Sequence, residues 1–177
     1  DRPGGIGIYS RNIVQHLLRL DERNQYLLIY NNPDHVGTYS HLPNVEEQAL
    51  PAGNQIVWDQ VLAARALSRW RADLVFNTKF SLPLWLKAKK VMVLHGATWY
   101  THPHMYPWHD IAYVRLAMPV YCRAADFLIS NSELTTSDFK RIVKVPPGKI
   151  ETVLLAAADH FKLIEDQAAL DKVRVKY

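Results

Sequence analysis

The sequence contains little that would point to disulfides or to a membrane span. Its 177 residues include a single cysteine, Cys122, so no internal disulfide can form, which is typical of a reducing compartment. No run of about 18 apolar residues is present, and this excludes a membrane-spanning helix. The first residues also lack the charged and then apolar pattern of a secretory signal. We therefore expect a cytoplasmic protein.

The charge of the chain is only mildly unbalanced. Lys and Arg number 21 and Asp and Glu number 17, which gives a net charge of +4. An excess this small does not indicate nucleic-acid binding, and we expect no nucleic-acid partner. It is compatible with an anionic substrate, or with peripheral contact with a lipid surface.

The composition is that of a folded domain. Apolar residues make up 49% and charged residues 21%, which argues against a disordered segment. A domain of this size buries about two-thirds of the surface of its unfolded chain. Repeats and low-complexity tracts are absent, so we interpret residues 1–177 as one domain. No strand precedes the first helix and half of the last eight residues are charged, so we expect a piece of a longer protein.

Helical and strand patterns alternate along the whole chain. Residues 97–107 predict a loop, and the nearly continuous apolar run 25–30 predicts a strand buried on both faces. Alternation of this kind is typical of an α/β fold with a mainly parallel, doubly wound sheet. Helices are predicted at 6–20, 56–71, 108–124 and 135–143, and strands at 25–30, 45–50, 73–77, 90–95, 126–130 and 150–155.

Glycines stand directly before the first predicted helix, at Gly4, Gly5 and Gly7. Glycine permits a close backbone approach, and the free N–H groups of a helix N-terminus favour a phosphate. The alternative is a glycine-rich turn that only starts the helix. The pattern alone leaves both interpretations open, because the strand that usually precedes such a phosphate loop is missing.

His95 follows a buried apolar strand, at the sheet edge where ligands bind in open α/β folds. An imidazole there can bond to a substrate hydroxyl or act as an acid or base, or the backbone can simply satisfy it. His102, His104 and His109 lie close by in the sequence. However, Pro103 separates the first two, and no carboxylate or cysteine joins them at ligand-like spacing. We expect no metal site.

Aromatic residues interleave with these histidines, at Trp99, Tyr100, Tyr106 and Trp108. Flat rings with polar tips suit contact with a sugar or a lipid headgroup, and they equally suit packing of the loop onto its own domain. Both interpretations stay open.

A polar segment follows the predicted strand 126–130 and begins the next helix. Ser132 is placed to cap that helix, and its position at the carboxyl edge of the sheet also permits a role in ligand binding. Cys122 lies in a helix with no neighbouring histidine, so we do not expect it to be a nucleophile.

Several stretches together resemble the N-terminal domain of a family 4 (group 1) glycosyltransferase of the two-domain GT-B architecture. Residues 4–9 with the helix after them resemble the glycine loop of that family. Residues 91–96 resemble its strand that ends in His-Asp. The most specific match is residues 123–133 followed by 145–150, which resembles an Ala-Asp pair, a strand, Ser-x-Ser, a helix and Pro-x-Lys-Ile.

The resemblance implies a Rossmann-like, acceptor-side domain, with the nucleotide-sugar held mainly by a second Rossmann-like domain. It implies transfer from a nucleotide-diphosphate-sugar to a saccharide or lipid-linked acceptor with retention, and it implies no cofactor or metal besides the substrates. Paired glutamates eight residues apart mark the donor domain of the family. This chain has none at that spacing, so we expect the C-terminal domain to lie outside it.

The resemblance also assigns residues to roles. The amides near Gly5 and Gly7 would contact the donor diphosphate, and His95 would contact the transferred sugar or the acceptor hydroxyl. The residues expected to line the cleft and the acceptor site are Trp99, Tyr100, Ser130, Ser132 and Glu133.

The sequence departs from the family at two places. Gly96 stands where the family commonly has Asp, so any role of that carboxylate is absent here. Residues 155–159 replace the usual entry to the interdomain linker. The alternative function is a non-catalytic α/β module that binds a phosphorylated ligand or a partner protein.

Overall fold

A computed structural model of the chain describes residues 4–158, 161 and 163–176, and these alternate between helices and strands. No helix among them is both long and apolar enough to cross a bilayer. The strands are β1 (Tyr26–Tyr30), β2 (Val45–Ala49), β3 (Leu74–Asn77), β4 (Lys89–Leu94), β5 (Phe127–Ser130) and β6 (Ile150–Thr152). The α-helices are α1 (Gly5–Leu20), α2 (Gln55–Val57), α3 (Ala64–Trp70), α4 (Thr98–Thr101), α5 (Trp108–Ala124), α6 (Glu133–Asp138) and α7 (Gln167–Lys176).

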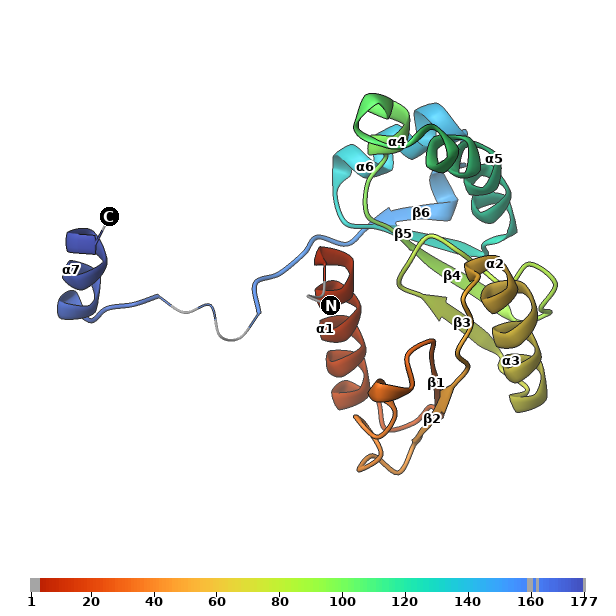
Figure 1. Ribbon diagram of the computed structural model, residues 1–177, viewed down its shortest axis with the longest axis horizontal. Coiled ribbons are helices and arrows are strands. Elements are labelled where there is room, and N and C mark those ends of the chain that lie inside the picture. The colour runs from red at the N-terminus through yellow and green to blue at the C-terminus, as the bar shows by residue number, and fades with distance from the viewer. Residues whose placement is uncertain (1–3, 159–160, 162, 177) are drawn as a thin grey trace.

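All strand pairs in the described residues are parallel, which confirms the predicted α/β class. They form two sheets rather than the single sheet that we expected. One has the order β3-β4-β5-β6, and the other contains β1 and β2 (Figure 1). Strand β1 is half-buried along its whole length, so the prediction of a strand covered on both faces was wrong. A strand is covered on both faces only where other elements pack against each side of its sheet, and the side chains of β1 are only partly covered.

The core lies between the four-stranded sheet and helices α5 and α6. Met92 and Leu94 from β4 and Leu128 from β5 meet Met118 from α5 and Phe139 from the segment after α6, and all five are fully or almost fully buried. Large side chains of this kind contribute roughly 1.5–3 kcal/mol each when fully buried. Strand β4 runs through this core, and its burial fixes the position of the residues at its carboxyl end.

Cys122 belongs to the same core. It is buried on the inner face of α5, and burial raises the pKa of its thiol to about 12. A thiol of that kind carries almost no thiolate at neutral pH. The structure therefore agrees with the expectation that Cys122 is not a nucleophile.

Some boundaries differ from the prediction. The helix expected at 56–71 is one helical stretch from Gln55 to Trp70, in which a π-helix, η2 (Trp58–Ala63), joins α2 to α3. The helix expected at 135–143 is α6 followed by a second π-helix, η4 (Phe139–Val143). The expected loop at 97–107 contains α4 and a 3₁₀ turn, η3 (Pro103–Met105). Beyond the last strand, α7 lies apart from the rest of the domain (Figure 1).

Candidate functional site

The carboxyl ends of the two central strands lie side by side. Leu94 at the end of β4 pairs with Ser130 at the end of β5, so His95 and Asn131 emerge next to each other. The Asn131 backbone N–H donates to the Leu94 carbonyl at 3.3 Å, and its side-chain Nδ2 donates to the His95 carbonyl at 3.4 Å. Two strands and one amide side chain therefore fix the backbone of His95.

Within the residues that the structure describes, a hydrogen bond holds only one of the two ring nitrogens of His95. Its Nε2 lies 2.7 Å from the carbonyl oxygen of Thr78, which can only accept a hydrogen bond, so Nε2 carries a proton. The rings of Tyr9 and Phe80 pack against the imidazole in T-shaped arrangements, with their centroids 4.8 and 5.6 Å from that of His95. No described residue bonds to Nδ1. The backbone thus satisfies one nitrogen, and the other is open to a ligand.

Glycines form the first turn of α1 instead of a loop before it, which corrects the position that we expected. Gly4 caps the helix, and the Ile8 N–H donates to the Gly4 carbonyl at 3.1 Å. The N–H groups at the start of a helix, here those of Gly5 and Gly7 among others, lack partners within the helix. A Cβ built on Gly5 meets no atom within 4 Å, and Gly7 is half-buried.

The conformation of these glycines does not itself demand glycine. Among the described glycines, positive φ angles occur at Gly37 and Gly96 but not at Gly4, Gly5 or Gly7. What glycine supplies at Gly5 is therefore open space around the backbone. The first turn of α1 also carries no acidic side chain. The positive end of a helix attracts anions, and no side chain of this first turn opposes that.

Helix α1 and His95 converge on Thr78, which follows β3. The Ser10 hydroxyl donates to the Ile6 carbonyl at 2.8 Å and lies 2.7 Å from the Thr78 hydroxyl. The Thr78 carbonyl accepts the bond from His95. Tyr9, which touches the His95 ring, lies four residues after Gly5, about one helical turn along α1. Three segments that are distant in the sequence thus meet at one corner of the domain.

The aromatic residues divide between the site and the core. Trp99 packs edge-on against Phe80 with centroids 4.7 Å apart, and Phe80 in turn contacts His95. Trp99 also touches Tyr106, at 5.6 Å. Tyr100 points the other way, since it packs on the core and its hydroxyl donates to the Val114 carbonyl at 3.3 Å.

Tyr100 was expected at the acceptor site, and its position corrects that expectation. Burial raises the pKa of its phenol to about 12. Its hydroxyl is used by the backbone of α5, so the residue fastens α4 to the domain. Of Trp99 and Tyr100, it is Trp99 whose ring contacts Phe80, the neighbour of His95.

Ser130 is the second correction, because its side chain is fully buried. Its hydroxyl bonds to that of Thr136 on α6, and it also lies 3.5 Å from the Glu151 carbonyl on β6. Nothing in the solvent can reach it. We therefore assign Ser130 to the packing between β5, α6 and β6 rather than to the lining of a cleft.

Ser132 caps α6 as predicted. Its hydroxyl accepts a hydrogen bond from the Thr135 N–H at 3.2 Å, while its side chain stays half-exposed. Glu133 is exposed in the first turn of the same helix, where a negative charge is favourable. These two residues rim the carboxyl edge beside Asn131.

The histidine cluster does not form a metal centre in the described part of the chain, where no three His, Cys, Asp or Glu side chains converge. The rings of His102 and His104 lie 6.0 Å apart, and Nδ1 of His102 is 2.9 Å from the Thr101 hydroxyl. His109 is exposed on α5, beside Asp110. The three histidines therefore lie on the surface of the aromatic segment.

Sequence reasoning missed the residues that hold the site together. Thr78 and Asn131 each follow a strand at the carboxyl edge, so the rule that singled out His95 applies to both. Tyr9 and Phe80 gave no comparable signal, since their contacts with His95 join positions that are far apart in the sequence.

Comparison with known families adds one finding. The model of the family described as Glycosyltransferase Family 4 matches residues 3–154, which is most of the chain. No curated protein matches the chain.

Proposed function

The chain belongs to glycosyltransferase family 4, and we propose that it is the acceptor-side domain of an enzyme that uses a nucleotide-diphosphate-sugar. The sugar passes to a hydroxyl of a saccharide or lipid-linked acceptor, with retention of the anomeric configuration. The observation that carries this proposal is the convergence of α1, through Ser10, and of His95 on Thr78. The N-terminal half of α1, whose first turn has unpaired amides, and a hydrogen-bonding imidazole lie together at one corner of the domain.

The first turn of α1 is proposed to contact the donor diphosphate. The N–H groups of Gly5 and Gly7 lie at the positive end of a 16-residue helix, and the first turn of that helix holds no acidic side chain. As the bond from the anomeric carbon to the phosphate oxygen breaks, negative charge grows on the departing diphosphate. Backbone amides already in position stabilise that charge without reorganising.

His95 is proposed to bind the transferred sugar or the acceptor hydroxyl through Nδ1. Because the Thr78 carbonyl holds Nε2 in its protonated form, a neutral His95 offers Nδ1 as an acceptor for a hydroxyl proton. Trp99 would flank the sugar, and Ser132 and Glu133 would supply polar contacts at the rim. Stacking on one face and hydrogen bonds along an edge suit a pyranose ring.

A strand before Gly4 is proposed to join the two sheets. Strand β1 is half-buried, Leu74 at the start of β3 is exposed, and α1 directly precedes β1 in the sequence. One added parallel strand between β1 and β3 would pair with both. The strand order of the sheet would then reverse beside α1. In open α/β sheets, ligands bind where the strand order reverses. This order is the doubly wound sheet that the sequence predicts.

The donor nucleotide is proposed to bind mainly to a second Rossmann-like domain, so the chain alone is expected to be inactive. Two-domain closure excludes water and holds the reacting groups at attack distance. We propose a cytoplasmic enzyme of saccharide biosynthesis, with no cofactor besides its substrates.

The test uses the complete reading frame that contains this chain. The purified enzyme is assayed with common nucleotide-diphosphate-hexoses and simple saccharide acceptors, and the anomeric configuration of the product is read by NMR. Transfer with retention supports the proposal. Inversion would overturn the stereochemical part. Binding of a phosphorylated ligand or a protein, without any transfer, would favour a non-catalytic module.

A further inference from the structure

The helical stretch from Gln55 to Trp70 exposes apolar and cationic side chains and no carboxylate. Val57, Val61, Arg65 and Arg69 recur four residues apart and are all exposed. The one acidic residue of the stretch, Asp59, is only 1% exposed, and desolvation raises its pKa. The outward side of this stretch therefore changes along its length from apolar to positively charged.

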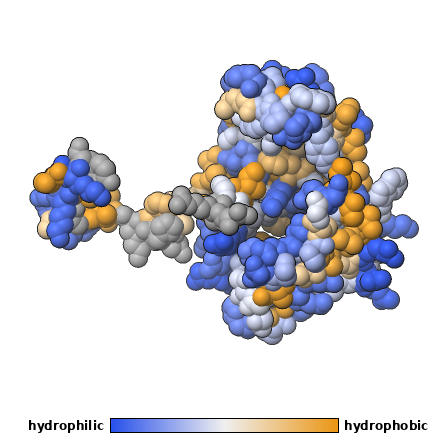
Figure 2. All heavy atoms as spheres, viewed as in Figure 1, coloured by the Kyte–Doolittle hydropathy of each residue, from blue (hydrophilic) through white to orange (hydrophobic). Residues whose placement is uncertain are grey.

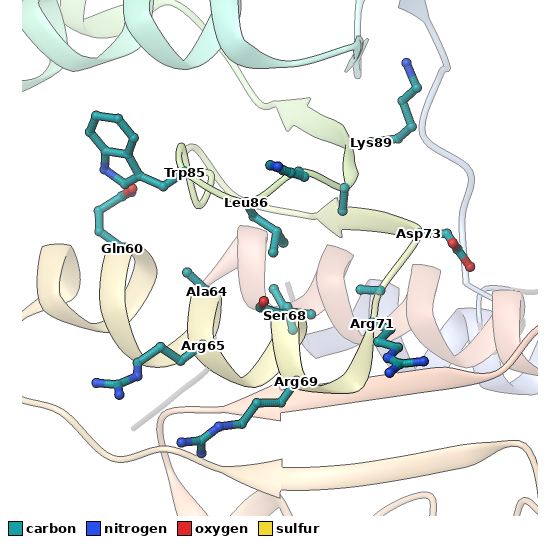
Figure 3. Close-up of a pocket in the computed structure, with 14 residues that line it drawn as sticks. Gln60, Ala64, Arg65, Ser68, Arg69, Arg71, Asp73, Trp85, Leu86 and Lys89 are labelled. Atoms are coloured by element: carbon teal, nitrogen blue, oxygen red, sulfur yellow. The ribbon is translucent and has the colours of Figure 1, made fainter.

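A hollow of about 870 Å³ lies beside the cationic half, between α3 and the segment that leads into β4 (Figure 3). It lies at the amino ends of the strands, away from His95. Trp85 stands over Gln60 at one end of it and is 85% exposed. Asp73 is the one carboxylate in its lining. The cations that line it are Arg65, Arg69, Arg71, Lys87 and Lys89.

Most of these cations are uncompensated. Lys89 pairs with Asp126 at 2.9 Å. In the part of the chain that the structure describes, the other four cations make no ion pair. One further carboxylate lies near, that of Glu46, and it accepts a hydrogen bond from Trp70 Nε1 at 3.0 Å. Free positive charge thus remains on this side of the domain.

Helix α5 continues the apolar half of the surface. Tyr113, Leu116 and Val120 are exposed at helical spacing, and Leu116 is 76% exposed. The Tyr113 hydroxyl lies 3.2 Å from that of Tyr121, and the Tyr121 side chain reaches Gln60, so the stripe on α5 adjoins η2. Figure 2 shows hydrophobic residues gathered along the side of the domain that α5 and α2 occupy in Figure 1.

We propose that this surface, which we call the α2–α5 face, docks the domain on a bilayer that contains anionic lipids. The face consists of Ile56, Val57, Val61, Trp85, Tyr113, Leu116 and Val120, with Arg65, Arg69, Arg71 and Lys87 beside them. Apolar side chains next to free cations match the boundary between acyl chains and anionic headgroups. An exposed tryptophan is favoured at that depth.

The shape and the exposure of the face favour a bilayer over an acidic protein. Its apolar residues project outward from two helices and one loop, so they can enter a soft interface without a matching groove. Trp85 and Leu116 are exposed far more than the floor of a preformed pocket would be. The proposal is independent of the sugar-transfer site and stands without it.

The experiment is co-sedimentation of the purified protein with two kinds of vesicle. One kind is phosphatidylcholine alone, and the other also contains phosphatidylglycerol. We expect binding to the anionic vesicles and a weakening of that binding at high salt. Arg65→Glu combined with Arg69→Glu should weaken binding by about tenfold or more. Trp85→Ser should weaken binding in low and high salt alike, because its contribution is apolar.

The matched control, Arg19→Glu with Arg23→Glu, reverses one exposed charge in the last turn of α1 and one just after that helix. It makes the same change of net charge away from the face, and it should retain most of the binding. Thermal melts of all variants verify folding. Equal loss in the control and the Arg65/Arg69 variant would overturn the proposal, as would absence of binding to anionic vesicles. Binding to soluble polyglutamate but not to vesicles would instead assign the face to an acidic macromolecule.

Discussion

The substitution Gly5→Val separates a role in donor binding from a role in folding. A Cβ at Gly5 meets no atom within 4 Å, so the larger side chain has room in the folded domain. Valine is at least as good a helix former as glycine. We therefore expect the melting temperature to stay within about 2 °C of wild type.

The reaction with the sugar donor, in contrast, should become much slower in this variant. The branched side chain would occupy the space that a phosphate needs in order to reach the first-turn amides of α1. Hydrogen bonds to a charged group contribute about 1.5–3 kcal/mol. Their loss corresponds to a fall in kcat/KM of about 10- to 100-fold in the complete enzyme. The assay is sugar transfer at varied donor concentration, together with a thermal melt.

Gly148→Val is the matched control. Gly148 also has open space around its Cβ position and no positive φ, and it lies before β6, at the opposite end of the strands. Its kcat/KM should stay within about twofold of wild type, as for an ordinary surface substitution. The reasoning would be refuted if Gly5→Val transferred sugar normally. A parallel loss of stability and activity, with unchanged donor affinity of the folded fraction, would refute it equally.

Three further predictions follow from single side chains. His95→Ala should lower kcat/KM of the complete enzyme while the melt stays cooperative, and full activity in this variant would remove His95 from the site. Gly96→Ala should cost about 1–3 kcal/mol of stability in a denaturant melt, because Gly96 has a φ of +155°, whereas Gly53→Ala, with open space and no positive φ, should cost little. Hydrogen bonds, chiefly from Tyr26, hold the pKa of Asp21 below its usual range, so the carboxylate stabilises the fold above about pH 4 and that contribution disappears as the pH falls further. Wild type and Asp21→Asn should therefore differ in melting temperature at neutral pH and converge in acid, and a constant difference would contradict this.

The regular elements could be predicted because their patterns are local. Apolar residues at helical spacing set α1, and the uninterrupted run before His95 set β4. The same reasoning could have placed Ser130 correctly. It lies two residues after Leu128 on one strand, so both point to the same face of the sheet, and Leu128 faces the core. A serine hydroxyl on the core face must therefore form its hydrogen bonds with other groups of the protein.

Other features could not be predicted because they depend on contacts between distant positions. Residues 97–107 have no clear period, and α4 is held by the contacts of Trp99 with Phe80 and of Tyr100 with α5. The protonated nitrogen of His95 is set by Thr78, a residue that carries no motif. The separation into two sheets depends on which strands find neighbours, and no local pattern encodes that.

The central claim is that the first turn of α1 and His95 face one ligand. The most direct measurement is an NMR titration of the isotope-labelled chain with a nucleotide-diphosphate-sugar. We expect millimolar or weaker affinity, because a few exposed amide contacts contribute on the order of 1 kcal/mol each. The shifts should concentrate on the amides of Gly5, Ile6 and Gly7 and on the His95 ring. Micromolar binding, or shifts centred on the hollow beside Trp85 with none at His95, would contradict the account.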